Sequence, residues 1–158
     1  MAEFRSRAVR SLVELHAIEL RRFLEIWSRF RSSGKPMPDA RGDDAYESPE
    51  RLAAHVQSAA RGYIIWMAEM LGRPIREIQR AKTWQEVWED FDGFTEQTLA
   101  AWEKHGALIT DEELSPAQSF QSRWGDPYGI EQMLEHAVVH PMRHRIQLER
   151  AMSAGQSG

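Results

Sequence analysis

Apolar residues recur every three or four positions in four long segments of the chain, which is the spacing of one face of an α-helix. The first helix is predicted from about residue 2 to residue 30. It ends before Gly34, because the prolines at 36 and 38 cannot readily continue a helix. Its inner stripe is predicted to consist of Leu12, Leu15, Glu19, Phe23, Ile26 and Phe30.

The next two helices carry recognisable end signals. Ser48-Pro49 predicts the start of the second helix, because serine accepts from the free amides of the first turn and proline there loses no hydrogen bond. Gly72 and the proline after it predict its end near residue 71. Thr83 and Glu86 form a capping box that predicts the start of the third helix, which is expected to run to Gly106.

The fourth helix is predicted to open at Asp126-Pro127 and to run to about residue 152. Residues 108–125 before it are predicted as a long crossover, with one helical turn where Thr110 and Glu113 form a second capping box. We therefore predict an all-α chain, a four-helix bundle with a long crossover between the third and fourth helices. One helical domain is expected over residues 1–152, with a disordered tail over residues 153–158.

Composition limits the function classes. The chain has 158 residues, 42% of them hydrophobic and 28% charged, which suffices for one buried core. Its net charge of −4 argues against a nucleic-acid partner, because that affinity comes mainly from Lys and Arg on phosphates. The first ten residues lack the apolar core of a signal peptide, and no apolar run approaches the roughly 20 residues of a membrane span. These patterns favour a cytoplasmic protein with no membrane partner.

The absence of cysteine excludes disulfides, thiolate metal sites and cysteine nucleophiles. Among the six histidines, His136, His140 and His144 follow one another four residues apart on the predicted last helix. Residues at this spacing lie one turn above each other, so an adjacent pair can bind one metal ion. The outer two are roughly 12 Å apart along the axis, so only one adjacent pair can share an ion.

A third ligand has to come from another helix, and His55 is the candidate. It lies on the inner stripe of the second helix with Leu52, Ala59 and Trp66. A single inward histidine is more often a core residue that bonds to a carbonyl, and an isolated pair four residues apart also arises by chance. The combination favours a metal, because burying three uncompensated imidazoles would cost roughly 1–3 kcal/mol each and a shared ion satisfies all three.

The segment EHAVVHPMRHRIQL at 135–148 resembles the last-helix signature of the DinB/YfiT-like superfamily of metal-dependent four-helix-bundle proteins, approximately H-x-x-x-H-x-x-x-H-R-x-Q. The resemblance extends over nearly the whole chain in helix order and length, although Ile146 stands where many members have glycine. It implies that His140 and His144 are metal ligands, that His55 is the third, and that His136 does not ligate.

Pro141 follows a proposed ligand inside the predicted helix. It removes the backbone hydrogen bond to the carbonyl of Ala137, which predicts a kink or a bulge there. Such a distortion either aims His140 at the ion or only adjusts packing.

Other polar and aromatic residues are candidates for roles near the metal. Gln147 is either a partner that orients a ligand or ordinary surface polarity. His16 and Glu19 on the first helix are candidates for a buried polar pair near the metal. Trp124, in the crossover, is the tryptophan best placed to line an apolar substrate pocket, whereas the others are most simply core residues.

Three neutral histidines leave one position open on a tetrahedral ion, which is typical of a reactive site. All-nitrogen ligation suits zinc or nickel. Proteins of the similar superfamily include S-transferases and isomerases that use low-molecular-weight thiols, and hydrolase-like members. We therefore expect a metal-dependent enzyme that activates a thiol or water for a small-molecule substrate, S-transferase-like, with no catalytic residue assigned. The alternative is a non-catalytic, metal-stabilised stress-response or interaction module, and the apolar helix faces also suit a homodimer.

Overall fold

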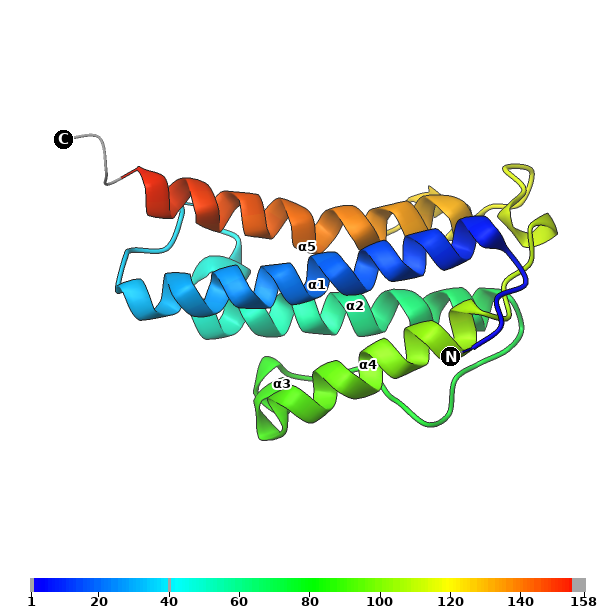
Figure 1. The fold of residues 1–158 in the computed structure, drawn as a ribbon, viewed down its shortest axis with the longest axis horizontal. Helices are drawn as coiled ribbons and strands as arrows, with labels where there is room; N and C mark the ends of the chain where they lie inside the picture. Colours follow the sequence, from blue (N-terminus) through cyan, green and yellow to red (C-terminus); the bar gives the residue numbers. More distant parts are fainter. Residues whose placement is uncertain (1, 40, 155–158) are drawn as a thin grey trace.

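A computed structural model describes residues 2–39 and 41–154, and over these residues the chain is mostly helical (Figure 1). Residues 155–158 of the predicted tail lie outside the described range, whereas Ser153 is the last residue of a helix. The elements in chain order are α1 (Arg7–Ser33), η1 (Asp44–Tyr46), α2 (Pro49–Met70), α3 (Trp84–Glu89), α4 (Phe91–Gly106), η2 (Glu112–Leu114), β1 (Phe120–Gln121), β2 (Pro127–Tyr128) and α5 (Ile130–Ser153).

The long helices lie along one another. Figure 1 shows α1 and α5 side by side and running in the same direction, with α2 and α4 running the opposite way. The most extensive contact is between α1 and α5, and α2 packs against both α4 and α5. The buried side chains between these helices therefore place residues of α2 close to residues of α5, although about eighty positions separate them in the sequence.

The chain returns along the helices at a different point from the one predicted. Residues 108–125 were expected to be the crossover, but the connection that contains them joins α4 to α5 at one end of the molecule. Residues 71–83 instead run back along the helices from α2 to α3 (Figure 1). Arg61 holds this returning segment: its guanidinium donates to the carbonyls of Gln79 and Phe94. It also lies 3.3 Å from the centroid of the Phe94 ring. A buried arginine on α2 thus ties the returning segment to α4.

The predicted inner stripe of α1 is rotated relative to the observed one. Leu15, expected inside, is 46% exposed, and Leu12 and Ile26 are only partly buried. Two neighbouring apolar rows run along this helix, and periodicity alone does not distinguish them when the core row also contains polar residues. The buried row is Val9, Val13, His16, Glu19, Leu20, Phe23, Trp27 and Phe30.

The predicted third helix is two helices, because Asp90 interrupts it. Asp90 has φ −149° and ψ 75°, outside the helical region, and its carboxylate accepts from the backbone N–H of Gly93 at 3.0 Å. A Cβ at position 93 would collide with that carboxylate, so any other residue there would force the Asp90 side chain out of the cap. The break directs α4 away from α3 while both pack on α2.

The last helix begins later than predicted. Asp126-Pro127, expected to open it, belongs instead to a small hairpin in which Gln121 pairs with Pro127. The turn between the strands depends on Gly125, whose φ of 98° favours glycine. α5 then starts after Gly129, whose N–H donates to the side chain of Gln132. The second predicted box is confirmed, since Thr110 and Glu113 bond reciprocally at η2.

A hydrogen bond from α1 to α5 replaces the one that Pro141 removes. Because proline has no N–H, the carbonyl of Ala137 lacks its usual helical donor, and His16 Nδ1 lies 2.9 Å from that oxygen. His16 is fully buried against Trp102, with 4.2 Å between the ring centroids. Burial lowers the pKa of His16 to about 4, so the neutral ring donates from Nδ1. α5 is α-helical throughout, without the bulge that the sequence allowed.

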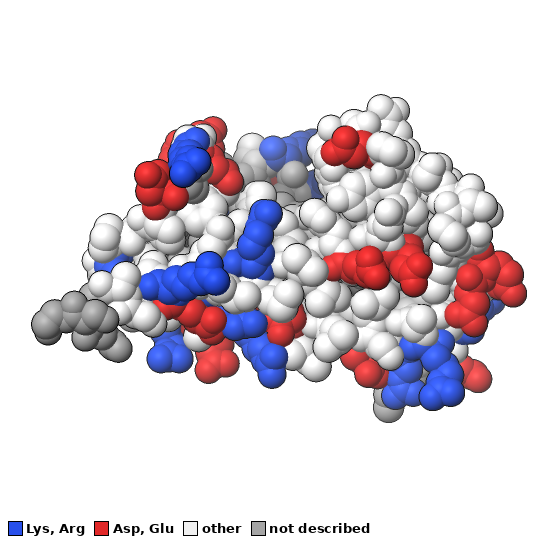
Figure 2. Space-filling view, turned by 90° about the horizontal axis from the view of Figure 1, so that it is seen from above, with Lys and Arg blue, Asp and Glu red and all other residues white. Residues whose placement is uncertain are grey.

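Acidic and basic side chains are interspersed on the surface seen in Figure 2. The exposed large apolar residues are Leu15, Ile18, Trp124 and Val139. Among the described residues, no helix has both the length and the apolar character needed to cross a membrane.

The neutral state of His16 predicts that stability falls as the pH is lowered. An unfolded chain protonates this residue near pH 6.5, whereas the buried ring stays neutral down to about pH 4. The unfolded state therefore binds more protons in that window, and His16 should contribute a loss of ~1.4 kcal/mol per pH unit within it. Urea unfolding of chelator-treated protein at pH 7.5 and pH 5 measures this loss. His16→Leu should show a smaller loss than the wild type, and equal losses would contradict the interpretation.

Candidate metal centre

Three histidines from two helices converge in the interior. α2 carries His55, and α5 carries His140 and His144 one turn apart on the face that packs against α2. One nitrogen of each lies within 4.8 Å of the others, and the Nε2 atoms of His55 and His140 are 3.1 Å apart. The structure thus brings together the three residues predicted as ligands, and these close histidines could hold one metal ion.

The unpaired nitrogen of His144 fits this role. His144 Nε2 is buried and has no hydrogen-bond partner among the described residues. Two nitrogens on one tetrahedral zinc ion lie about 3.4 Å apart, since each bond is about 2.0–2.1 Å. The separation between His55 and His140 is close to that value. The donor set also fits, because three imidazoles suit zinc, nickel, copper or iron but not calcium or magnesium.

Burial keeps these imidazoles uncharged. Desolvation, with the charges of the neighbouring histidines, lowers the pKa of His140 to about 2. Desolvation also lowers the pKa of His144 to about 4, and it lowers the pKa of His55. The charge of Arg143 lowers all three pKa values further, whereas the carboxylate of Asp43 opposes this at His55 and His144. At neutral pH the lone pairs are therefore free to bind a cation without first releasing protons.

A tyrosine that the sequence did not single out orients His144. Tyr46 Oη, in η1, lies 2.6 Å from His144 Nδ1 and also hydrogen-bonds to Gln147 Oε1. The amide oxygen can only accept, so the hydroxyl donates to it and receives a hydrogen bond from Nδ1–H. This tautomer leaves the Nε2 lone pair of His144 for a metal. Burial raises the pKa of Tyr46 to about 12, so the hydroxyl remains protonated.

His136 lies beside the three histidines and is not part of the close group. Its ring is 6.0 Å from His140 and stacks on Trp124 at 5.4 Å. The rings of Tyr63 and Tyr128 meet its edge. His136 therefore connects the hairpin turn to α5 through aromatic contacts.

The other polar candidates have structural partners. His16 and Glu19 are both buried but do not bond to each other: His16 bonds to the carbonyl of Ala137, and Glu19 forms ion pairs with Arg22 and Arg145. Gln147 is the partner of Tyr46, which favours the orienting role over simple surface polarity.

Two hollows of different character meet at His55. One, of about 360 Å³, follows α2 toward the hairpin turn and has largely apolar and aromatic walls that include Trp124. The other, of about 380 Å³, is lined by charged residues, among them Asp43, Asp44 and Lys82. His55 and Ser58 line both, so small molecules can approach this end of the histidine group from two sides.

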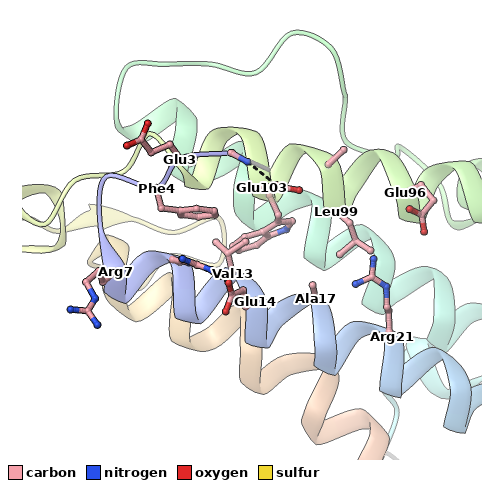
Figure 3. A pocket seen from close by; sticks show the side chains of 14 residues that line it. Glu3, Phe4, Arg7, Val13, Glu14, Ala17, Arg21, Glu96, Leu99 and Glu103 are labelled. Carbon is pink, nitrogen blue, oxygen red and sulfur yellow. Dashed lines mark hydrogen bonds and ion pairs between the residues drawn. The ribbon is translucent and has the colours of Figure 1, made fainter.

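A larger cavity lies elsewhere. It has a volume of about 730 Å³ and lies between α1 and α4, with Phe4, Val13 and Leu99 facing into it (Figure 3). The N-terminus closes one end, where the backbone N–H of Ala2 donates to Glu103. None of the three converging histidines lines this cavity, so it is separate from the candidate centre.

Comparison with protein-family models, with curated proteins and with solved structures gave no match to this chain. The candidate centre is therefore described by its own geometry.

The bond from His144 to Tyr46 predicts that Tyr46→Phe weakens metal binding. Loss of the hydroxyl removes the acceptor that fixes the ring and tautomer of His144, so affinity for zinc or nickel should fall about 10–100-fold. Isothermal titration calorimetry on chelator-treated protein measures this change. Tyr128→Phe, which alters a tyrosine in the hairpin, is the control and should bind zinc or nickel with wild-type affinity. If Tyr46→Phe binds the metal as tightly as this control, the orienting role is disproved.

Proposed function

We propose that this chain is a metal-dependent enzyme in which His55, His140 and His144 hold one divalent ion, zinc or nickel, beside a small-molecule pocket. We propose further that its long helices form a four-helix bundle of the DinB/YfiT-like type, which the motif around His140 resembles. The observation that carries the proposal is the convergence of three uncharged imidazoles, two buried and one half-buried, next to a hollow. When bound, such an ion lowers the pKa of a water ligand to about 7 or holds a thiol as its thiolate.

The residues of the chain support this chemistry in separate ways. Desolvation keeps the ligands deprotonated, and Tyr46 with Gln147 fixes the ring of His144. The cation Arg143 disfavours protonation of the histidines. These groups provide a fixed set of lone pairs, and preorganised donors of this kind lower the cost of reorganisation during a reaction.

The hollow beside His55 favours an enzyme over a structural metal site. A structural ion is enclosed by four protein ligands, whereas here three histidines converge and space for a small molecule lies at one of them. α2, the returning segment, the hairpin turn and α5 line this hollow. The resemblance to thiol-dependent proteins leads us to prefer thiol transfer over hydrolysis.

The alternative is a non-catalytic, metal-stabilised module in stress response or in dimeric interaction. The placement of the histidines on two helices supports this alternative. His55 lies on α2, whereas His140 and His144 lie on α5, so an ion bound by all three would cross-link the two helices. This alternative predicts that metal removal lowers the melting temperature while no thiol-dependent or hydrolytic turnover is detected.

Metal analysis of untagged protein, followed by calorimetric titration with zinc and nickel, tests the proposal. The wild type should bind about one ion per chain, and His140→Ala should lose more than about 100-fold in affinity, since changes to groups behind the ligands already cost 10–100-fold. His136→Ala, one turn earlier on the same helix, is the matched control and should retain binding. A screen with low-molecular-weight thiols and electrophilic or ester substrates then separates the enzyme from the module. Absence of metal binding by the wild type would reject both.

A further inference from the structure

The hollow of about 360 Å³ is built on one stripe of α2. His55, Ala59, Tyr63 and Trp66 follow each other at helical spacing, and the small residues Ser58, Ala59 and Gly62 leave the space. His55 and Trp66 are eleven residues apart, which corresponds to roughly 16 Å along a helix axis. The hollow is therefore a trough with the candidate metal centre at one end. Its volume is at the lower end of the range for small-molecule pockets, about 300–1,000 Å³.

Aromatic rings form the walls of this trough. Tyr63 and Trp66 are almost completely buried, whereas Trp124 is 47% exposed and meets Tyr63 edge-on at 6.4 Å. The indole N–H of Trp66 donates to the carbonyl of Gln121, which fixes the hairpin over α2. Flat apolar surfaces of this kind favour a planar ring, because aromatic pairs gain from stacked and edge-to-face contact.

Positive charge lies at the far end. Arg80 and Arg123 line both the trough and an adjoining hollow of about 300 Å³ that includes Trp66 and Glu69. Arg80 is already neutralised, because it forms two hydrogen bonds of 2.9 Å with the carboxylate of Glu69. Hydrogen bonds from Arg80 lower the pKa of Glu69, and the charge of Arg123 lowers it further, so Arg123 is close to this pair.

Arg123 is left without a counter-ion. Among the described residues it forms no ion pair and no side-chain hydrogen bond, and no Asp or Glu lines the trough. Two arginines against one glutamate leave one net positive charge beside an aromatic pocket. A guanidinium pairs best with a carboxylate, which it contacts through two parallel hydrogen bonds, and one unpaired arginine matches one negative charge.

We propose that the trough binds an aromatic carboxylate, with its ring against the aromatic wall formed by Tyr63, Trp66 and Trp124 and its carboxylate on Arg123. The other end of such a molecule then lies toward His55, which makes an aromatic acid the substrate class of the proposed enzyme. Only this last step depends on the proposed metal-dependent function; recognition of the acid does not require an ion.

The test uses the full chain, treated with chelator so that a carboxylate cannot bind to a metal. The probes are 2-naphthoate and its neutral counterpart 2-naphthylmethanol, which share one ring system. Titrations followed through the indole N–H signals of ¹⁵N-labelled protein give both dissociation constants. We expect 2-naphthoate to bind the wild type at least about tenfold more tightly than the alcohol, because hydrogen bonds between charged groups are stronger than those of a neutral hydroxyl.

Variants assign that preference to one residue. Arg123→Gln should bind both probes equally, and Arg123→Lys should keep part of the preference, since lysine supplies the charge without the paired donors. Arg76→Gln, which removes an exposed arginine outside the trough, is the matched control and should behave as the wild type. Arg143→Gln removes the cation that acts on the three histidines, and it should also retain the preference.

Three results would overturn the proposal: no binding of either probe, equal binding of both probes by the wild type, or a preference that survives in Arg123→Gln. A preference lost in Arg143→Gln instead would likewise reject the assignment to Arg123. Because all arms use metal-free protein, their outcome is independent of the metal titration. Binding of the acid without any binding of zinc or nickel would uphold recognition by Arg123 while rejecting the proposed metal centre.

Discussion

The hydrogen bond from His16 to the carbonyl of Ala137 is the contact on which the arrangement of α1, α5 and the histidine group depends. Pro141 deprives that carbonyl of its helical partner, and an unsatisfied buried carbonyl would be costly. The imidazole of His16 supplies the missing donor from another helix and thereby fixes the depth at which α1 packs on α5. Ala137 lies one helical turn before His140, which directly precedes Pro141, so this contact is next to the histidine group.

Several histidines in the interior of the protein are buried with neutral rings. His16, His140 and His144 each occupy a site where a charged ring would be strongly disfavoured, and each has a different task. His16 completes a helix, His144 is held by a tyrosine, and His140 meets His55. The burial that accompanies helix packing also lowers the pKa values of these histidines. Folding of the chain therefore leaves their rings deprotonated at neutral pH.

Much of this could be predicted from the sequence, and the rest could not for identifiable reasons. The histidine trio followed from helical spacing and the motif, because α-helical periodicity places His140 and His144 on one face. Tyr46 lies in η1, a turn too short to show periodicity, and only the folded chain places it next to His144, 98 positions away. The break at Asp90 arises because its carboxylate accepts a hydrogen bond from the backbone N–H of Gly93. The helical spacing of apolar residues continues across Asp90, so the sequence pattern does not indicate this break.

The path of the chain was the least predictable part. The connections 71–83 and 107–129 both lack a long helix, and their lengths do not reveal which of them runs back along the helices (Figure 1). One contact that holds the returning segment comes from Arg61, a charged residue in a buried position. Hydrophobic periodicity does not predict this contact, because it identifies only apolar residues as buried.

The position of His55 between two hollows has a kinetic consequence. One hollow is walled largely by apolar and aromatic side chains, and the other contains several ionised groups. In the proposed enzyme, two reactants of unlike polarity would use different hollows, and a ternary complex would form in which neither molecule has to leave before the other enters. Steady-state rates would then give intersecting rather than parallel double-reciprocal lines, and a molecule that blocks one entrance would leave the second open.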